Sequence, residues 1–126
     1  MAIYGIGAFF DKDKSKYFIS NNLIGIGWSM ADAPELFQYI KSLKVGDIVY
    51  IKSFSPRSHN LIIKGIGIIK DDNIISNTII TCGRNVIWKN TSNLIIAKPQ
   101  EKNNVRANTL YEEFHPIIQG FILRNI

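Results

Sequence analysis

The apolar residues between positions 33 and 43 follow the spacing of an amphipathic helix. They recur at the i, i+4, i+7 interval that places side chains on one helix face, and they are Leu36, Phe37, Ile40 and Leu43. Ser29 or Asp32 can cap the start of this helix, and Pro34 suits its first turn, where a missing N–H is tolerated. We therefore predict a helix over about 33–43 whose apolar face packs on a sheet.

Short runs rich in β-branched and aromatic residues alternate with polar turns along most of the chain. Residues 48–54 and 61–69 form two such runs, separated by a hydrophilic loop that contains Pro56. This pattern predicts a central antiparallel hairpin. The same composition predicts further short strands, separated by turns that include 71–73 and 83–85. These strands lie over 2–10, 17–20, 23–28, 77–82, 86–89 and 93–98.

The last part of the chain carries two signals for short helices. Thr109, with Glu112 three residues later, forms a capping-box pattern that predicts one helical turn over 109–114. The apolar residues after Pro116 suit either a short C-terminal helix or a closing strand, and we predict the helix.

Several short strands with one internal helix and a short C-terminal helix favour a small α+β fold. We predict a closed or half-closed mixed β-barrel, because closure removes the exposed edges of a sheet. Gly-Ile-Gly occurs at 5–7, 25–27 and 65–67, where glycine marks bends, bulges or close contacts of the backbone. None of these tripeptides extends to a dinucleotide-binding or phosphate-loop motif, so neither fold is supported.

Length and composition indicate one globular domain over 1–126, with 46% hydrophobic residues. We see neither a membrane span nor a signal peptide, and we expect a cytoplasmic protein. Cys82 is the only cysteine, which excludes an internal disulfide and a multi-cysteine zinc site. We expect this thiol to be reduced and buried, and we expect no metal or cofactor.

A formal net charge of +5 favours a polyanionic partner, because each cation that neutralises a phosphate releases counterions. Most of the basic residues are lysines scattered singly along the chain, which is also typical of a solvated surface. Ile, Asn and Lys share A/T-rich codons, so the composition can equally report a genome of low G+C content.

One stretch of about residues 24–90 is similar to PUA-like domains of the EVE and YTH groups. The matching features are Trp28 after a strand, the helix 33–43, the turn and strand Gly46-Asp47-Ile48-Val49, and the returning Gly65-Ile66-Gly67-Ile68. Trp88 resembles a further tryptophan on a later strand. The resemblance implies a PUA-like barrel that holds one flipped or single-stranded base, often a modified one. In bacteria such domains are often coupled to restriction of modified DNA.

With that resemblance, the sequence predicts a small nucleic-acid-binding module with an aromatic pocket for a nucleobase. Trp28 is the first predicted wall, and the second is chosen among Trp88, Tyr50 and Phe54. Ser29 and Ser53 are predicted to bond the base edge. The predicted phosphate contacts are Lys52, Arg57 and Arg84. The alternative for both tryptophans is a place in the core, and for the loop around Arg57 a solvated surface.

Two other classes of function stay open. A nuclease related to the ASCH branch of the same superfold would need a GxKxxxxR-like run, which this chain lacks, and we predict no catalytic residue. A phage- or defence-associated interaction protein could instead use the same pocket as a nucleotide sponge, or block a host partner. The two histidines and the one cysteine give no argument for a catalytic pair.

Overall fold

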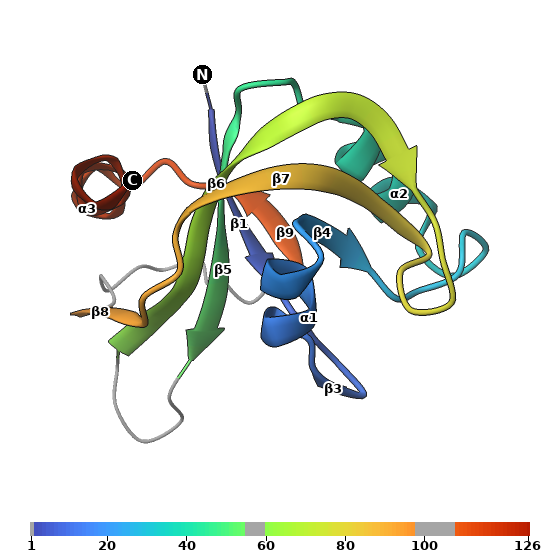
Figure 1. Ribbon diagram of the computed structural model, residues 1–126, viewed down its shortest axis with the longest axis horizontal. Coiled ribbons are helices and arrows are strands. Elements are labelled where there is room, and N and C mark those ends of the chain that lie inside the picture. Colours follow the sequence, from blue (N-terminus) through green and yellow to red (C-terminus); the bar gives the residue numbers. More distant parts are fainter. Residues whose placement is uncertain (1, 55–59, 98–107) are drawn as a thin grey trace.

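In the part of the chain that the structure describes, a mixed sheet of seven strands forms the body of the protein (Figure 1). The computed structural model describes residues 2–54, 60–97 and 108–126. The sheet order is β4-β7-β6-β5-β1-β9, and β8 pairs with β6 outside that path. The strands are β1 (Ile3–Gly7), β4 (Leu23–Ile26), β5 (Ile48–Phe54), β6 (Asn60–Ile75), β7 (Cys82–Asn90), β8 (Leu94–Ala97) and β9 (Leu110–Glu112).

The sheet is not closed into a barrel. Among the described strands its order begins at β4 and ends at β9, and no pairing joins these two ends. A separate two-stranded ribbon consists of β2 (Phe9–Phe10) and β3 (Lys12–Asp13). The small α+β fold predicted from the sequence is therefore confirmed, whereas closure of the sheet is not observed.

The central hairpin predicted from the sequence is confirmed. β5 and β6 pair antiparallel from Ile48 opposite Ile68 to Phe54 opposite Leu61, with a register shift between Ile51 and Lys52. On its other side β5 pairs in parallel with β1. That pairing joins residues more than forty positions apart along the chain, which no local pattern predicts.

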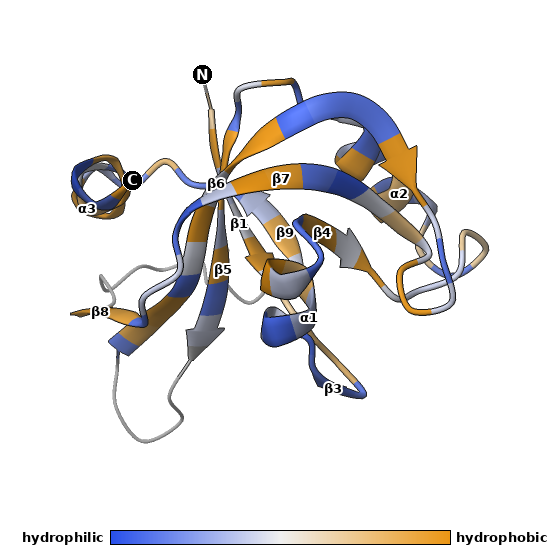
Figure 2. Ribbon diagram, in the orientation of Figure 1, coloured by the Kyte–Doolittle hydropathy of each residue, from blue (hydrophilic) through white to orange (hydrophobic). Residues whose placement is uncertain are grey.

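Helices cover both faces of the central strands. In β5 the side chains alternate: Val49 and Ile51 join one hydrophobic cluster, while Ile48 and Tyr50 join another. The first cluster includes residues of α1 (Ser15–Ser20) and α2 (Pro34–Ser42), and the second includes residues of α3 (Pro116–Asn125). Figure 1 shows α3 on the side of the sheet away from α1 and α2, and Figure 2 shows hydrophobic residues along the strands between them.

The predicted amphipathic helix is confirmed as α2. It buries Phe37 and Ile40, Leu43 is buried at its C-terminal cap, and Leu36 packs at the margin of the same cluster. The C-terminal helix is also confirmed as α3, where Nδ1 of His115 accepts a hydrogen bond from the backbone N–H of Ile117 (3.2 Å).

The prediction of a single internal helix is wrong, because residues 17–20 belong to α1 and not to a strand. Asp13 fixes the start of α1: its Oδ1 accepts hydrogen bonds from the backbone N–H (2.9 Å) and the hydroxyl (2.6 Å) of Ser15. Phe18 is then buried in the first cluster. Burial of this ring outweighs the strand preference of so short a segment.

The region 109–114 also differs from its predicted helical turn. Its residues Leu110–Glu112 form β9, which pairs antiparallel with β1. Residues 71–73 and 83–85 were predicted as turns but lie inside β6 and β7. At 71–73 the β6–β7 register shifts between Ile69 and Ile74. A bulge therefore replaces the first of these turns, and the strand predicted over 77–82 begins only at Cys82.

The Gly-Ile-Gly tripeptides lie where large side chains cross the backbone. A Cβ added at Gly5 would come within 2.4 Å of the Tyr111 ring, so this ring lies directly on β1. Gly65 and Gly67 similarly lie beneath the ring of Trp88. Close approach of side chains, one of the roles predicted for these glycines, is thus observed.

Within the described ranges, no helix has the length and apolar character needed to cross a bilayer.

Replacing Leu43 by alanine should lower the free energy of unfolding by about 2–5 kcal/mol, because it leaves a cavity under the end of α2. Val45→Ala is the matched control, since Val45 is exposed two residues away. Urea unfolding of both variants measures the effect. Equal stability of the two variants would mean that the apolar face of α2 does not hold the helix on the sheet.

Candidate functional site

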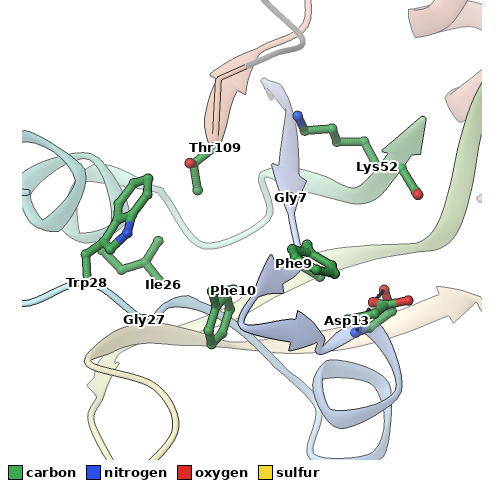
Figure 3. Close-up of a pocket in the computed structure, with 12 residues that line it drawn as sticks. Gly7, Phe9, Phe10, Asp13, Ile26, Gly27, Trp28, Lys52 and Thr109 are labelled. Carbon is green, nitrogen blue, oxygen red and sulfur yellow. Dashed lines mark hydrogen bonds between the residues drawn. The ribbon is translucent and has the colours of Figure 1, made fainter. Parts of the chain in front are cut away.

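A pocket of about 540 Å³ opens beside the C-terminal ends of β1, β4 and β5 (Figure 3). The β2–β3 ribbon and the first residue of α1 complete its wall. Its aromatic lining consists of Phe9, Phe10 and Trp28. We call this cavity the Trp28 pocket.

Two of the three aromatic rings are open to solvent and the third is anchored. The exposed fractions are 77% for Phe9 and 48% for Trp28. Phe10 packs against Phe18 with ring centroids 6.2 Å apart, and a Cβ at Gly27 would lie 2.5 Å from its ring. Phe10 therefore joins the pocket to the core, whereas Trp28 and Phe9 present apolar surface at the edge of the cavity.

The backbone that carries Trp28 is fixed although its side chain is exposed. Oγ1 of Thr81 lies within hydrogen-bonding distance of the carbonyl oxygens of Ile26 (2.9 Å) and Trp28 (2.5 Å). The backbone N–H of Thr81 also donates to the carbonyl of Ile26 (2.9 Å). These contacts hold the end of β4 at the pocket, so the indole projects from an ordered position.

Asp13 supplies the carboxylate of the pocket. Its Oδ2 accepts from Nζ of Lys64 (2.5 Å), and its Oδ1 accepts from the hydroxyl of Ser15 (2.6 Å). Partial desolvation acts to raise the pKa of Asp13, but the hydrogen bonds from Lys64 and Ser15 and the positive charge of Lys64 outweigh it and lower the pKa to about 2. The pocket therefore holds a fixed negative charge, paired with Lys64, at neutral pH.

The opposite side of the pocket carries donors and hydroxyls. Lys52 and Ser53, at the end of β5, line it together with Thr109. Nζ of Lys52 lies 5.7 Å from the centroid of the Tyr111 ring, a cation–π distance. The carbonyl of Thr109 accepts a hydrogen bond from the backbone N–H of Gly7 (2.8 Å), which fixes this wall to β1.

Of the residues predicted from the sequence, the structure brings Trp28, Lys52 and Ser53 together in this pocket. Ser29 lies outside it. Its hydroxyl donates to Oδ2 of Asp32 (2.9 Å) and accepts from the backbone N–H of Asp32 (3.2 Å), in the turn before α2. Ser29 is thus a turn-forming residue near the start of the helix.

Tyr50 is not a pocket wall. It is fully buried in the second cluster, where its hydroxyl contacts the hydroxyl of Tyr111 (2.7 Å) and donates to Oε1 of Glu113 (2.6 Å). Burial, followed by the neighbouring Tyr111 and Glu113, raises the pKa of Tyr50. The alternation of side chains along β5 directs this residue towards α3, whereas the pocket lies beyond the end of the core.

Trp88 does not share the pocket with Trp28. Its ring packs on Gly65 and Gly67, and its Nε1 donates to the carbonyl of Phe18 (3.0 Å). Its remaining surface lines a second cavity. The two tryptophans therefore cannot form the opposite walls of one base site.

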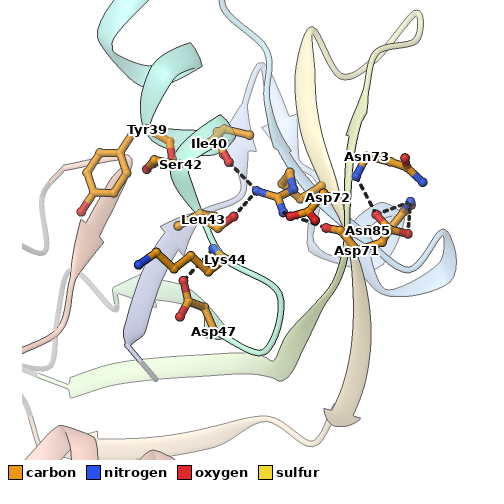
Figure 4. Close-up of polar contacts among 11 residues, drawn as sticks. Tyr39, Ile40, Ser42, Leu43, Lys44, Asp47, Asp71, Asp72, Asn73 and Asn85 are labelled. Atoms are coloured by element: carbon orange, nitrogen blue, oxygen red, sulfur yellow. Dashed lines mark hydrogen bonds and ion pairs between the residues drawn. The ribbon is translucent and has the colours of Figure 1, made fainter.

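Arg84 is a buried structural residue, which corrects its prediction as a phosphate contact. Figure 4 labels three residues whose backbone carbonyls bond its guanidinium, Ile40, Leu43 and Asp71. Nη1 of Arg84 donates to the carbonyls of Ile40 (3.0 Å) and Leu43, and its Nη2 donates to the carbonyl of Asp71 (2.7 Å). Nε, buried as well, has no partner among the described residues. The guanidinium joins the C-terminal end of α2 to the β6–β7 bulge and has no access to a ligand.

Two predicted site residues fall at the limits of the described chain. Phe54 is the last residue of β5, and its side chain lies outside the described residues, as does the whole of Arg57.

The residues that the β2–β3 ribbon and α1 bring to the pocket were not predicted from the sequence. They are Phe9, Phe10, Asp13 and Ser15, together with Thr109 from the segment before β9. The one available signal was the adjacent phenylalanine pair before a charged turn, because two neighbouring rings of a strand cannot both face the core.

The described residues give little support for a metal site or a reactive thiol. They contain no group of three or more His, Cys, Asp and Glu side chains placed to hold a metal ion. Cys82 is buried, as predicted, and burial raises the pKa of its thiol against the opposing charges of Lys41 and Arg84. No protein-family model matches the chain, and no curated protein matches it.

We expect Arg84→Ala to lower the free energy of unfolding by roughly 3 kcal/mol or more, because it leaves three carbonyl acceptors without their donor. Arg124→Ala, at an exposed arginine in the last turn of α3, is the control and should change stability little. Thermal unfolding measures both. A stable Arg84→Ala protein that has lost ligand binding would instead restore the phosphate-contact role.

The Asp13 contacts should give a pH-dependent contribution to stability. The pKa of Asp13 in the folded protein is about 2, below its ordinary value of 3.8. The contribution to stability is therefore fully present above pH 3.8 and is lost as the pH falls towards 2. The stability difference between the wild type and Asp13→Asn should therefore shrink over this window. Chemical unfolding at several acidic pH values measures it, and a constant difference would contradict the assigned pKa.

Proposed function

We propose that this protein is a small base-binding module that holds one nucleobase of a nucleic acid in the Trp28 pocket. The observation that carries the proposal is the indole of Trp28, 48% exposed on an ordered backbone at the wall of a cavity. A ring held open to solvent forgoes the stabilisation that burial would give it. A planar ligand stacked on the ring recovers that burial.

The remaining lining suits a base and its phosphate. Stacking on an aromatic side chain is worth about 1–3 kcal/mol per base and tolerates any base. Ser53 and Thr109 offer groups for hydrogen bonds to a base edge, and the ammonium of Lys52 supplies positive charge on the same side. A volume of about 540 Å³ lies within the range of pockets that enclose small organic ligands.

The proposal includes kinship with PUA-like base-binding domains. The succession of Trp28, α2 and the β5–β6 hairpin supports it, since these are the features on which the resemblance in the sequence rests. The open sheet need not prevent this function, because the pocket is built from strand ends and the β2–β3 ribbon. A role in restriction or phage defence would then follow from the kind of base that is bound.

The Trp28→Ala variant should bind single-stranded nucleic acid about 5- to 150-fold more weakly, which corresponds to the loss of one stacked base. Its stability should fall by less than the about 3–5 kcal/mol that a buried tryptophan costs, because about half of this residue is exposed. Fluorescence anisotropy of a labelled single strand of mixed sequence, in DNA and RNA forms, measures binding. Thermal unfolding of the same variant measures stability.

Phe114→Ala is the matched control, since Phe114 is 71% exposed and does not line the Trp28 pocket. It should bind like the wild type. Equal affinity of the wild type and Trp28→Ala would refute the proposal. A free mononucleotide that binds as tightly as any strand would favour the nucleotide-sponge alternative over a nucleic-acid ligand.

A further inference from the structure

A second cavity of about 460 Å³ lies at the opposite end of α1 from the Trp28 pocket. It is lined by one aromatic ring, one cation and several side-chain amides, including Trp88, Lys70, Asn21, Asn22 and Asn85. We call it the Trp88 pocket. Its lining combines the residue types that contact bases and phosphates in nucleic-acid complexes.

The two pockets flank one short, well-anchored helix. Ser15, the first residue of α1, lines the Trp28 pocket, while Asn21, which follows its last residue, lines the Trp88 pocket. Six helical residues span about 9 Å, a length that two to three nucleotides cover at the roughly 3.4 Å spacing of a stacked strand. The ring of Phe18 and its carbonyl contact residues of both pockets, Phe10 and Trp88.

Positive charge lies along α1, between the Trp28 pocket and the Trp88 pocket. Lys14 places its Nζ 5.9 Å from the Phe10 ring centroid, Lys16 is exposed on α1, and Lys70 lines the Trp88 pocket. None of these three lysines forms an ion pair within the described residues, whereas the carboxylate of Asp13 is paired with Lys64. The lysines therefore offer unneutralised charge to a phosphate backbone between the two pockets.

The Trp88 pocket also contains an unused amide. The side chain of Asn22 is exposed and forms no hydrogen bond with any described residue, and its backbone has a φ of 54°. Asparagine amides pair with two atoms of a base edge at once, most often on adenine.

We infer that the ligand is a single strand of nucleic acid that passes from the Trp28 pocket over α1 to the Trp88 pocket, with its phosphates beside Lys14 and Lys16. This inference rests on the proposed function. It adds that one nucleotide fills only half of the site. A strand of several nucleotides engages both pockets, and the second contact becomes intramolecular once the first is made.

The test compares ligands of different length on the same protein. Nucleoside monophosphates and single strands of about eight nucleotides, in DNA and RNA forms, compete with a labelled strand in fluorescence anisotropy. The strand should bind at least about tenfold more tightly than the monophosphate. Quenching of the Trp28 fluorescence in a Trp88→Phe protein reports separately whether the monophosphate occupies the Trp28 pocket.

Two variants remove the path without touching the Trp28 pocket. Lys16→Gln combined with Lys70→Gln should weaken strand binding by roughly three- to tenfold at low salt and reduce the salt slope by about 1.4. Monophosphate affinity should not change. Lys41→Gln combined with Lys44→Gln removes the same charge from exposed positions that line neither pocket, and should leave strand binding nearly unchanged. Asn22→Gly, which tolerates the positive φ, should weaken strand binding alone.

The outcomes separate this inference from the proposed function. If the monophosphate quenches Trp28 but the strand binds no more tightly, the inference fails and the proposed function stands. If both lysine pairs weaken strand binding equally, the attraction is unspecific and the path is refuted. If neither ligand binds, the proposed function fails and the inference fails with it.

Discussion

β5 is buried on both of its faces, and the helices are arranged to cover them. A strand covered on two sides needs an apolar layer above and below, and α1 and α2 supply one layer while α3 supplies the other. The double cover ends where the register shifts between Ile51 and Lys52. Beyond that shift β5 carries Lys52 and Ser53 to the Trp28 pocket. The site therefore begins where the two-sided core stops.

The side of the core that faces α3 contains a polar group of its own. The hydroxyls of Tyr50 and Tyr111 lie within hydrogen-bonding distance of each other, and Oε1 of the buried Glu113 accepts from Tyr50. A buried carboxyl group is costly unless it is hydrogen-bonded, so this network favours one placement of the segment that contains β9. Gly5 leaves room for the Tyr111 ring on β1. The network and the glycine together explain why this segment pairs with β1 as a strand.

The Trp28 pocket combines a fixed frame with exposed rings. Thr81 holds the backbone of Trp28, and Phe10 anchors the β2–β3 ribbon in the core. A rigid frame reduces the entropy lost when a ligand binds, because the aromatic surface is already in place. The helix α1 closes one side of this pocket and, at its other end, places Asn21 in the lining of the Trp88 pocket. A short element with few buried residues therefore organises both cavities.

Elements whose signals are local and periodic were predictable from the amino-acid pattern alone. The spacing of Leu36, Ile40 and Leu43 predicted α2, and two apolar runs around a polar loop predicted the β5–β6 hairpin. The sequence also named Trp28, Lys52 and Ser53, which meet in one pocket.

No local pattern predicted the open sheet, the parallel pairing of β1 with β5, the strand β9 or the burial of Tyr50 and Arg84. Each of these depends on contacts between residues far apart in the chain. The free energy of such contacts exceeds the small local preferences that a sequence pattern records.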